Sequence, residues 1–175
     1  MPVRSILQLG NPLLLEKSQP VHDCTSAIIQ QIIEDLRDTL AHFRQMHGYG
    51  RGIAAVQIGE LQRIIYIRMQ PTGFCGALIN PVITYASSET ITLWDDCFSF
   101  PDLLVQVKRA TRITVAYLDE AGQAQTLQAE DDLSELLQHE IDHLDGTLAI
   151  LRAISPSAFA TREEWQRRYQ PIDNV

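Results

Sequence analysis

The sequence has few cysteines, no long apolar run and fewer basic than acidic residues. Its 3 cysteines are Cys24, Cys75 and Cys97. An odd number, in a chain whose first residues carry no apolar signal segment, argues against a disulfide framework and indicates the cytoplasm. No stretch approaches the roughly 18 apolar residues of a membrane helix, so we expect no membrane partner.

Basic residues number 14 against 22 acidic ones, which gives a formal net charge of -8. Phosphate contacts require clustered Lys and Arg, so this balance argues against nucleic acid as the main ligand. The 175 residues, 45% of them hydrophobic, are enough for one domain with a sizeable core. We therefore expect a single soluble domain over residues 1–175 that is a monomer.

Hydrophobic spacing predicts two helices of ordinary length and several short strands. A long helix is expected from Thr25 to about His47, and a second from Asp131 or Asp132 to Asp145. A short third helix is expected over residues 161–169. Strands are expected over 63–68, 77–85, 90–94, 103–108, 111–118 and 124–129. Because strands outnumber crossover helices, the pattern favours an α+β fold in which mainly antiparallel short strands pack around the second helix.

The second predicted helix contains His139, Glu140 and His143 in the spacing H-E-x-x-H. Histidines four apart on a helix differ by about 40° around its axis, so both imidazoles face the same way. Such a pair can bind a divalent metal, and the adjacent glutamate can take a proton from a water molecule on that metal. Two unrelated surface histidines are the alternative, but neighbouring leucines predict that this helix is half buried.

A catalytic metal usually has a third protein ligand. Downstream of His143 the carboxylates of Asp145, Glu163, Glu164 and Asp173 are available, but none lies in a second motif. Upstream, Cys97 lies between carboxylates and aromatic residues, and its thiolate would complete a Cys/His/His site. The alternative is that Cys97 is a small buried apolar residue, which is the commonest role of cysteine.

Gly50–Gly59 is rich in small residues that allow a ligand to approach the backbone closely. The segment lacks the lysine and the spacing of a phosphate-binding loop. A turn before a core strand is the simpler interpretation, and Gln57 within it could be a solvated amide.

In this order, the three segments resemble the three motifs of the peptide deformylase family, and the similarity spans roughly Ile6 to Leu151. The third motif, Q-H-E-apolar-D-H-apolar-x-G, is matched throughout by Gln138–Gly146. The first, G-apolar-G-apolar-A-A-x-Q, is matched by Gly50, Gly52–Ala55 and Gln57. The second, E-G-C-apolar-S, keeps Cys97–Ser99.

This resemblance implies a metal-dependent hydrolase that removes the formyl group from N-formylmethionyl peptides and releases formate. Cys97, His139 and His143 would be the metal ligands. The metal would be Fe²⁺, with Zn²⁺, Ni²⁺ or Co²⁺ able to replace it. Glu140 would be the general acid/base, and Gln57 with the backbone N–H of Phe98 would form the oxyanion hole.

The resemblance also implies an apolar cleft for the methionine side chain. We expect its walls to come from six residues in or near the first two motifs and just before the third: Arg51, Gly52, Leu93, Asp95, Phe98 and Leu136. Arg51 and Asp95 have opposite charges and could pair across the cleft, or both could be solvated. Asp142 does not share the histidine face and could anchor the helix to a neighbouring element.

The chain departs from the family pattern near the expected cleft. Arg51 replaces an apolar residue, Val56 replaces a common proline, Asp95 and Asp96 replace Glu-Gly, and Leu104 stands where an arginine is frequent. These changes leave acyl and peptide specificity open.

Three alternatives therefore remain: a relative acting on another N-acyl peptide, a non-catalytic metal-binding relative, and a general H-E-x-x-H metallopeptidase. The C-terminal arginines Arg162, Arg167 and Arg168 suggest transient ribosome docking, but nearby glutamates make a solvated helix the simpler interpretation.

Overall fold

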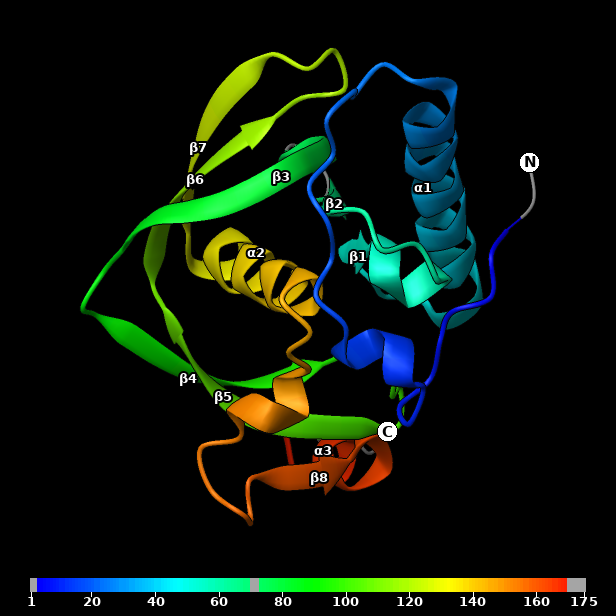
Figure 1. Ribbon diagram of the computed structural model, residues 1–175. Coiled ribbons are helices and arrows are strands. Elements are labelled where there is room, and N and C mark those ends of the chain that lie inside the picture. Colours follow the sequence, from blue (N-terminus) through cyan, green and yellow to red (C-terminus); the bar gives the residue numbers. More distant parts are fainter. Residues whose placement is uncertain (1–2, 70–72, 170–175) are drawn as a thin grey trace.

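The computed structural model describes residues 3–69 and 73–169 (Figure 1). Within these residues the strands form a five-stranded sheet, in the order β1-β2-β3-β6-β7, and a three-stranded sheet, in the order β4-β5-β8. Neighbouring strands in both sheets are antiparallel. The predicted α+β class with antiparallel pairing is therefore confirmed.

The elements have the following bounds. The larger sheet consists of β1 (Gly52–Ala54), β2 (Ile64–Arg68), β3 (Cys75–Ala86), β6 (Arg112–Leu118) and β7 (Ala124–Glu130). The smaller sheet consists of β4 (Thr90–Asp96), β5 (Leu103–Ala110) and β8 (Phe159–Thr161). The helices are α1 (Ala27–His47), α2 (Asp131–Leu144) and α3 (Arg162–Tyr169), with short 3₁₀ turns at Pro12–Leu15, Ala55–Ile58 and Ala149–Arg152. Among the described helices, none is both long and apolar enough to cross a membrane.

All of the predicted strands occur, with ends shifted by one or two residues. The sequence missed β1 and β8, because three-residue strands are too short to show an alternating pattern. Gly50–Gly59 contains the expected turn before a core strand, as the 3₁₀ turn that precedes β2, and also the short strand β1. This turn carries Gln57 and is fully buried.

Helix α1 packs one apolar face against the strands beside it (Figure 1). Ser26 occupies its N-cap position, but its side chain makes no capping bond there. Gly48 ends the helix in the left-handed conformation, with φ 79°, and its N–H donates to the carbonyl of Arg44.

Helix α2 lies centrally, between strands of the two sheets (Figure 1). Its leucines Leu137 and Leu144 are fully buried in an apolar cluster with the larger sheet. Asp131 and Asp132 in its first turn interact favourably with the positive end of the helix dipole. The apolar contacts fix the rotation of α2 and thus aim its histidine face away from the larger sheet.

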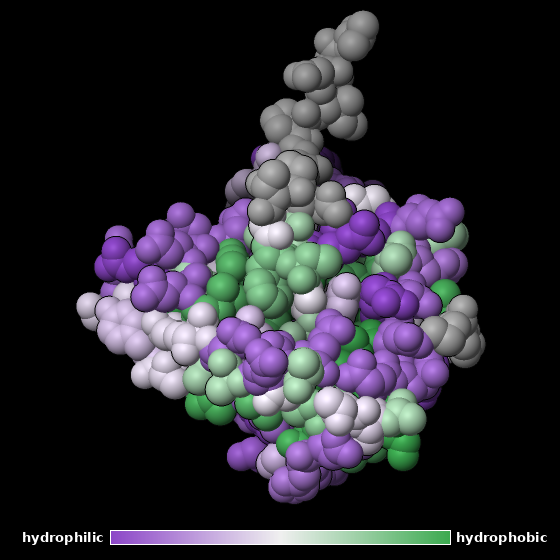
Figure 2. All heavy atoms as spheres, turned by 90° about the horizontal axis from the view of Figure 1, so that it is seen from above, coloured by the Kyte–Doolittle hydropathy of each residue, from purple (hydrophilic) through white to green (hydrophobic). Residues whose placement is uncertain are grey.

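Polar side chains dominate the outer surface in the view from above, with smaller apolar patches between them (Figure 2). This distribution agrees with the burial of the large apolar residues in clusters around α1 and α2. The stability of the fold therefore depends mainly on these interior contacts.

Replacing Leu137 with alanine should lower the free energy of unfolding by about 2–5 kcal/mol, because it leaves a cavity beside the sheet. The matched control is Ile28→Ala on α1, where the side chain is 72% exposed. That change should shift stability by no more than about 0.5 kcal/mol. Urea denaturation of both variants gives the comparison, and equal losses would contradict the assigned core.

Candidate metal centre and active site

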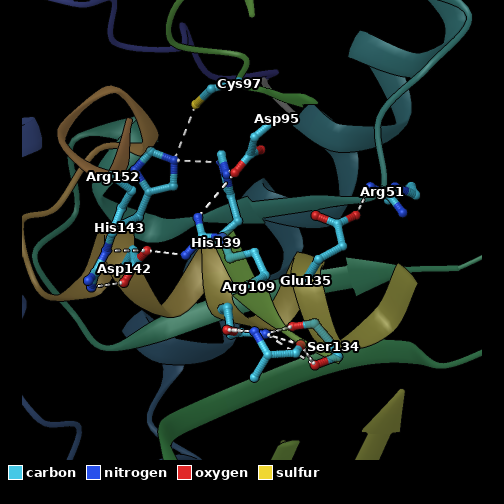
Figure 3. Close-up of polar contacts among 12 residues, drawn as sticks. Arg51, Asp95, Cys97, Arg109, Ser134, Glu135, His139, Asp142, His143 and Arg152 are labelled. Atoms are coloured by element: carbon cyan, nitrogen blue, oxygen red, sulfur yellow. Dashed lines mark hydrogen bonds and ion pairs between the residues drawn. The ribbon is translucent and has the colours of Figure 1, made fainter. Parts of the chain in front are cut away.

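Three potential metal ligands converge at one buried point, as Figure 3 shows in part. Cys97 directly follows β4, whereas His139 and His143 lie one turn apart on α2. The Cys97 Sγ lies 3.2 Å from His143 Nε2, which in turn lies 3.2 Å from His139 Nε2. All three atoms lie within 4.8 Å of one another. The expected Cys/His/His cluster is thus brought together in space.

The chemistry of this cluster fits a divalent ion. With metal–sulfur and metal–nitrogen bonds of about 2.3 and 2.1 Å, tetrahedral ligand atoms lie roughly 3.4–3.6 Å apart, close to the two separations of 3.2 Å that involve His143. Burial and the neighbouring His139 hold the pKa of His143 well below its usual value. The neutral imidazole that results is the form that binds metals.

Asp95 orients the first histidine. Its Oδ1 lies 2.8 Å from His139 Nδ1, while the other ring nitrogen, Nε2, lies 3.2 Å from His143 Nε2 and so on the side of the ligand cluster. Burial alone would raise the pKa of Asp95, but His139 and Arg109 outweigh it and lower that pKa to about 2. Asp95 is therefore a carboxylate acceptor under all ordinary conditions.

A buried ion-pair network fixes this carboxylate. Arg109, near the end of β5, donates from Nη2 to Asp95 at 3.1 Å and from Nη1 to Asp142. Asp142 also accepts from Arg152 at 2.7 Å. The hypothesis that Asp142 anchors α2 to neighbouring elements is confirmed. Removing one member of such a network would leave a buried charge without a partner, which strongly destabilises the folded protein.

Glu140 lies beside the ligand cluster, and its Oε2 has no hydrogen-bond partner among the described residues although it is buried. Burial raises the pKa of Glu140 to about 7. A carboxyl group with this pKa can both accept and return a proton near neutral pH. Gly52 makes room for it, since a Cβ at position 52 would lie 2.6 Å from Glu140 Oε1.

Gln57 places an amide donor beside Cys97 of the cluster. Its Nε2 lies 3.5 Å from Cys97 Sγ and 3.2 Å from Ser99 Oγ. Its Oε1 accepts from the backbone N–H of Ala54 at 2.9 Å, which fixes the orientation of the amide. Gln57 is 2% exposed, so the alternative of a solvated surface amide is wrong. Phe98 follows Cys97 directly, and its ring stacks on Phe43.

A cavity of about 510 Å³ opens beside these groups. The expected wall residues that line it are Arg51, Gly52, Asp95, Phe98 and Leu136. Leu93 is not among the lining residues and packs instead on the apolar cluster around Cys97 and Val105. Its expected place in the wall is wrong, because β4 carries it roughly 6–7 Å along the strand from Asp95.

The suggested Arg51–Asp95 pair does not form. Arg51 pairs with Glu135 and lies 4.0 Å from Asp132, while Asp95 is held by His139 and Arg109. Asp95 is buried, and Arg109 and His139 already contact it on its own side of the site. Burial raises the pKa of Glu135, and the neighbouring Arg51 opposes that rise.

The C-terminal segment forms a further wall that the sequence did not reveal. Arg162 donates to Asp96 at 2.7 Å and to the carbonyl of Pro101 at 2.6 Å, and its guanidinium lies 4.5 Å from the centre of the Tyr49 ring. Trp165 lines the cavity from the same segment.

Sequence reasoning also missed Glu135, Arg109 and Arg162. Glu135 precedes His139 by four positions on the same helix and so shares its face, which was a usable signal. Arg109 follows Val105 and Val107 at alternate positions on the buried face of β5, and a charged residue on that face indicates a buried partner. Arg162 was noted only as one of the C-terminal arginines, and no local pattern placed it beside the cavity.

Comparison with known proteins agrees with this geometry. The family model described as polypeptide deformylase matches residues 3–158. A peptide deformylase of Caldanaerobacter subterraneus subsp. tengcongensis is 37% identical over 164 residues, covering 94% of this chain and 96% of that protein. The fold and the site together define a hydrolase with a Cys/His/His cluster that fits a metal ion. The chain belongs to the polypeptide deformylase family.

Solved structures give the same result. The peptide deformylase of Ehrlichia chaffeensis in complex with actinonin has a TM-score of 0.81 and 33% identity, covering 89% of this chain and 91% of that one. A Met-Ala-Ser-bound class I type b peptide deformylase of Acinetobacter baumannii has a TM-score of 0.79 and 27% identity, covering 86% and 98%.

Cys97→Ser should reduce the affinity for Fe²⁺ by at least about tenfold, because a hydroxyl replaces the thiolate ligand. Metal analysis of anaerobically purified protein, loaded at matched Fe²⁺ concentrations, measures this loss. Cys75→Ser is the control, since Cys75 is exposed and outside the cluster. Unchanged iron content in the Cys97 variant would place the third ligand elsewhere.

Proposed function

We propose that this protein hydrolyses the formyl group of N-formylmethionyl peptides and releases formate with a free amino terminus. The observation that carries the proposal is the Cys97/His139/His143 cluster beside Glu140 and Gln57. Membership of the polypeptide deformylase family supports the same reaction. The Met-Ala-Ser bound to a relative corresponds to the peptide product of such a reaction.

We assign Cys97, His139 and His143 as the ligands of Fe²⁺, which Zn²⁺, Ni²⁺ or Co²⁺ could replace. A thiolate with two imidazoles suits these borderline ions better than Mg²⁺ or Ca²⁺. When bound, such an ion lowers the pKa of a water molecule and polarises a carbonyl group.

Glu140 serves as the proton carrier. Its carboxylate accepts a proton from the attacking water as oxygen bonds to the formyl carbon. It then delivers that proton to the peptide nitrogen as the carbon–nitrogen bond breaks. The pKa near 7 supports both halves of this cycle at neutral pH.

Gln57 and the backbone N–H of Phe98 stabilise the negative charge that develops on the formyl oxygen. The fixed orientation of the Gln57 amide supports this role, because a preorganised donor needs no rearrangement during the reaction. The close approach of Gly52 to Glu140 leaves backbone rather than a side chain at that edge of the cleft.

We further propose that residues 1–175 act as one catalytic domain and as a monomer in the cytoplasm. There it would meet new peptides near the ribosome, with any ribosome contact transient. The acidic net charge supports peptides rather than nucleic acid as ligands. Sedimentation with purified ribosomes and analytical ultracentrifugation test these two points.

Glu140→Ala should keep the metal and lower kcat for formyl-Met-Ala-Ser by about 10²–10⁴, because the proton carrier is removed. Formate release and metal content are measured on the same anaerobic preparation. Glu163→Ala, an exposed change, is the control. Full activity of the Glu140 variant would remove this residue from its role, and cleavage of unformylated internal peptide bonds by the unaltered protein would favour a general metallopeptidase.

Gln57→Ala should lower kcat by about 10²–10³ with a smaller change in KM, as expected for a donor that acts mainly in the transition state. The exposed Gln128→Ala serves as its control. Steady-state kinetics on formyl-Met-Ala-Ser separate the two parameters. A change confined to KM would assign Gln57 to ground-state binding instead.

A further inference from the structure

An ion pair forms part of the cavity wall. Arg51, which immediately precedes β1, donates from Nη2 to Glu135 Oε1 on α2 (Figure 3). The Glu135 side chain is 10% exposed and that of Arg51 is 40% exposed. Both residues line the cavity, and Glu140 and His139 line it as well. The pair therefore joins two elements that also hold the reacting groups.

The pair is within reach of the first side chain of a substrate bound in this cavity. Glu135 is one helical turn before His139, and Leu136 is one turn before Glu140. Arg51 adjoins Gly52, whose backbone approaches Glu140. In a formyl peptide only the amide nitrogen separates the reacting carbon from the first Cα. That residue's side chain consequently extends into the space beside Glu140.

The surroundings of the pair carry an excess of negative charge. Asp132 lies 4.0 Å from Arg51 and is largely exposed, so two carboxylates face one guanidinium. Among the described residues, Arg51 is the one partner recorded for the Glu135 carboxylate, through Oε1. Figure 3 shows the second oxygen of Glu135 directed away from Arg51, toward the histidine side of the site.

These features disfavour an apolar side chain in comparison with a polar one. An apolar side chain that covers the pair displaces water from charged groups without replacing its hydrogen bonds. A side chain with an N–H or O–H group can donate to Glu135 in a charge-assisted hydrogen bond. Leu136 still offers an apolar surface for the stem of a long side chain.

We propose that the Arg51–Glu135 pair is a specificity determinant that favours formylated peptides whose first side chain donates a hydrogen bond. Methionyl peptides remain substrates. The pair reduces the preference for them over peptides whose first side chain is polar and of similar length. Glutamine is the suitable probe because it matches methionine closely in length. The inference rests on the proposed deformylase function.

The first experiment compares kcat/KM for formyl-Gln-Ala-Ser and formyl-Met-Ala-Ser. Replacing the pair by apolar residues, Arg51→Ile with Glu135→Leu, should lower the Gln/Met ratio at least tenfold. The control is Arg112→Ile with Glu89→Leu, an exposed pair whose closest recorded contact is 3.9 Å. This control should leave the ratio unchanged. An unaltered or higher ratio in the Arg51/Glu135 variant would overturn the proposal.

A binding measurement separates this inference from the proposed function. Calorimetry with metal-loaded protein gives Kd for Gln-Ala-Ser and Met-Ala-Ser, and it needs no turnover. The apolar variant should shift the ratio of the two Kd values tenfold toward Met-Ala-Ser. If this shift appears without formate release from either formyl peptide, the pocket assignment stands and the proposed activity fails. If neither tripeptide binds, the pocket assignment is wrong.

Glu135→Gln provides a variant of nearly equal volume in case the double replacement does not fold. It converts the charge-assisted hydrogen bond into a neutral one, so the Gln/Met ratio should fall in both measurements. Thermal unfolding and metal content confirm that the variant is intact. A ratio equal to that of the unaltered protein would overturn the role of the carboxylate.

Discussion

The site depends on the contact between the Asp95 carboxylate and the Nδ1 atom of His139. This contact decides which imidazole nitrogen of His139 faces Cys97 and His143. It therefore decides whether the three ligand atoms point toward one position. Arg109 holds Asp95 from the opposite side and also reaches Asp142 on the same helix as the histidines. These contacts thereby hold a strand of the smaller sheet and helix α2 in fixed relative positions around the metal position.

The same arrangement explains how a protein interior can hold so many charged groups. Each buried charge in the network has an opposite charge within hydrogen-bond distance, which offsets the loss of hydration. Glu140 differs, because its Oε2 is buried without a partner in the described part of the chain. Burial without such a partner raises the pKa of Glu140, and this carboxyl group lies beside the donor set.

The sequence predicted those parts of the site that local geometry determines. Helical spacing alone places His139 and His143 on one face, whatever the rest of the fold. The choice of Cys97 over downstream carboxylates depended on resemblance, since no spacing rule connects it to α2. The partner of Arg51 could not be predicted, because it lies 84 positions away and several carboxylates compete for it. Strand β8 was too short to give a pattern, so the wall formed by the C-terminal segment was also missed.

That wall has a consequence for the order in which the site is assembled during synthesis. Every ligand, Glu140 and Gln57 precede position 144, whereas Arg162 and Trp165 leave the ribosome later. The metal-binding core can close before the strand and helix at 159–169 dock beside Asp96. The cavity therefore acquires its final shape only when residues 159–169 have docked.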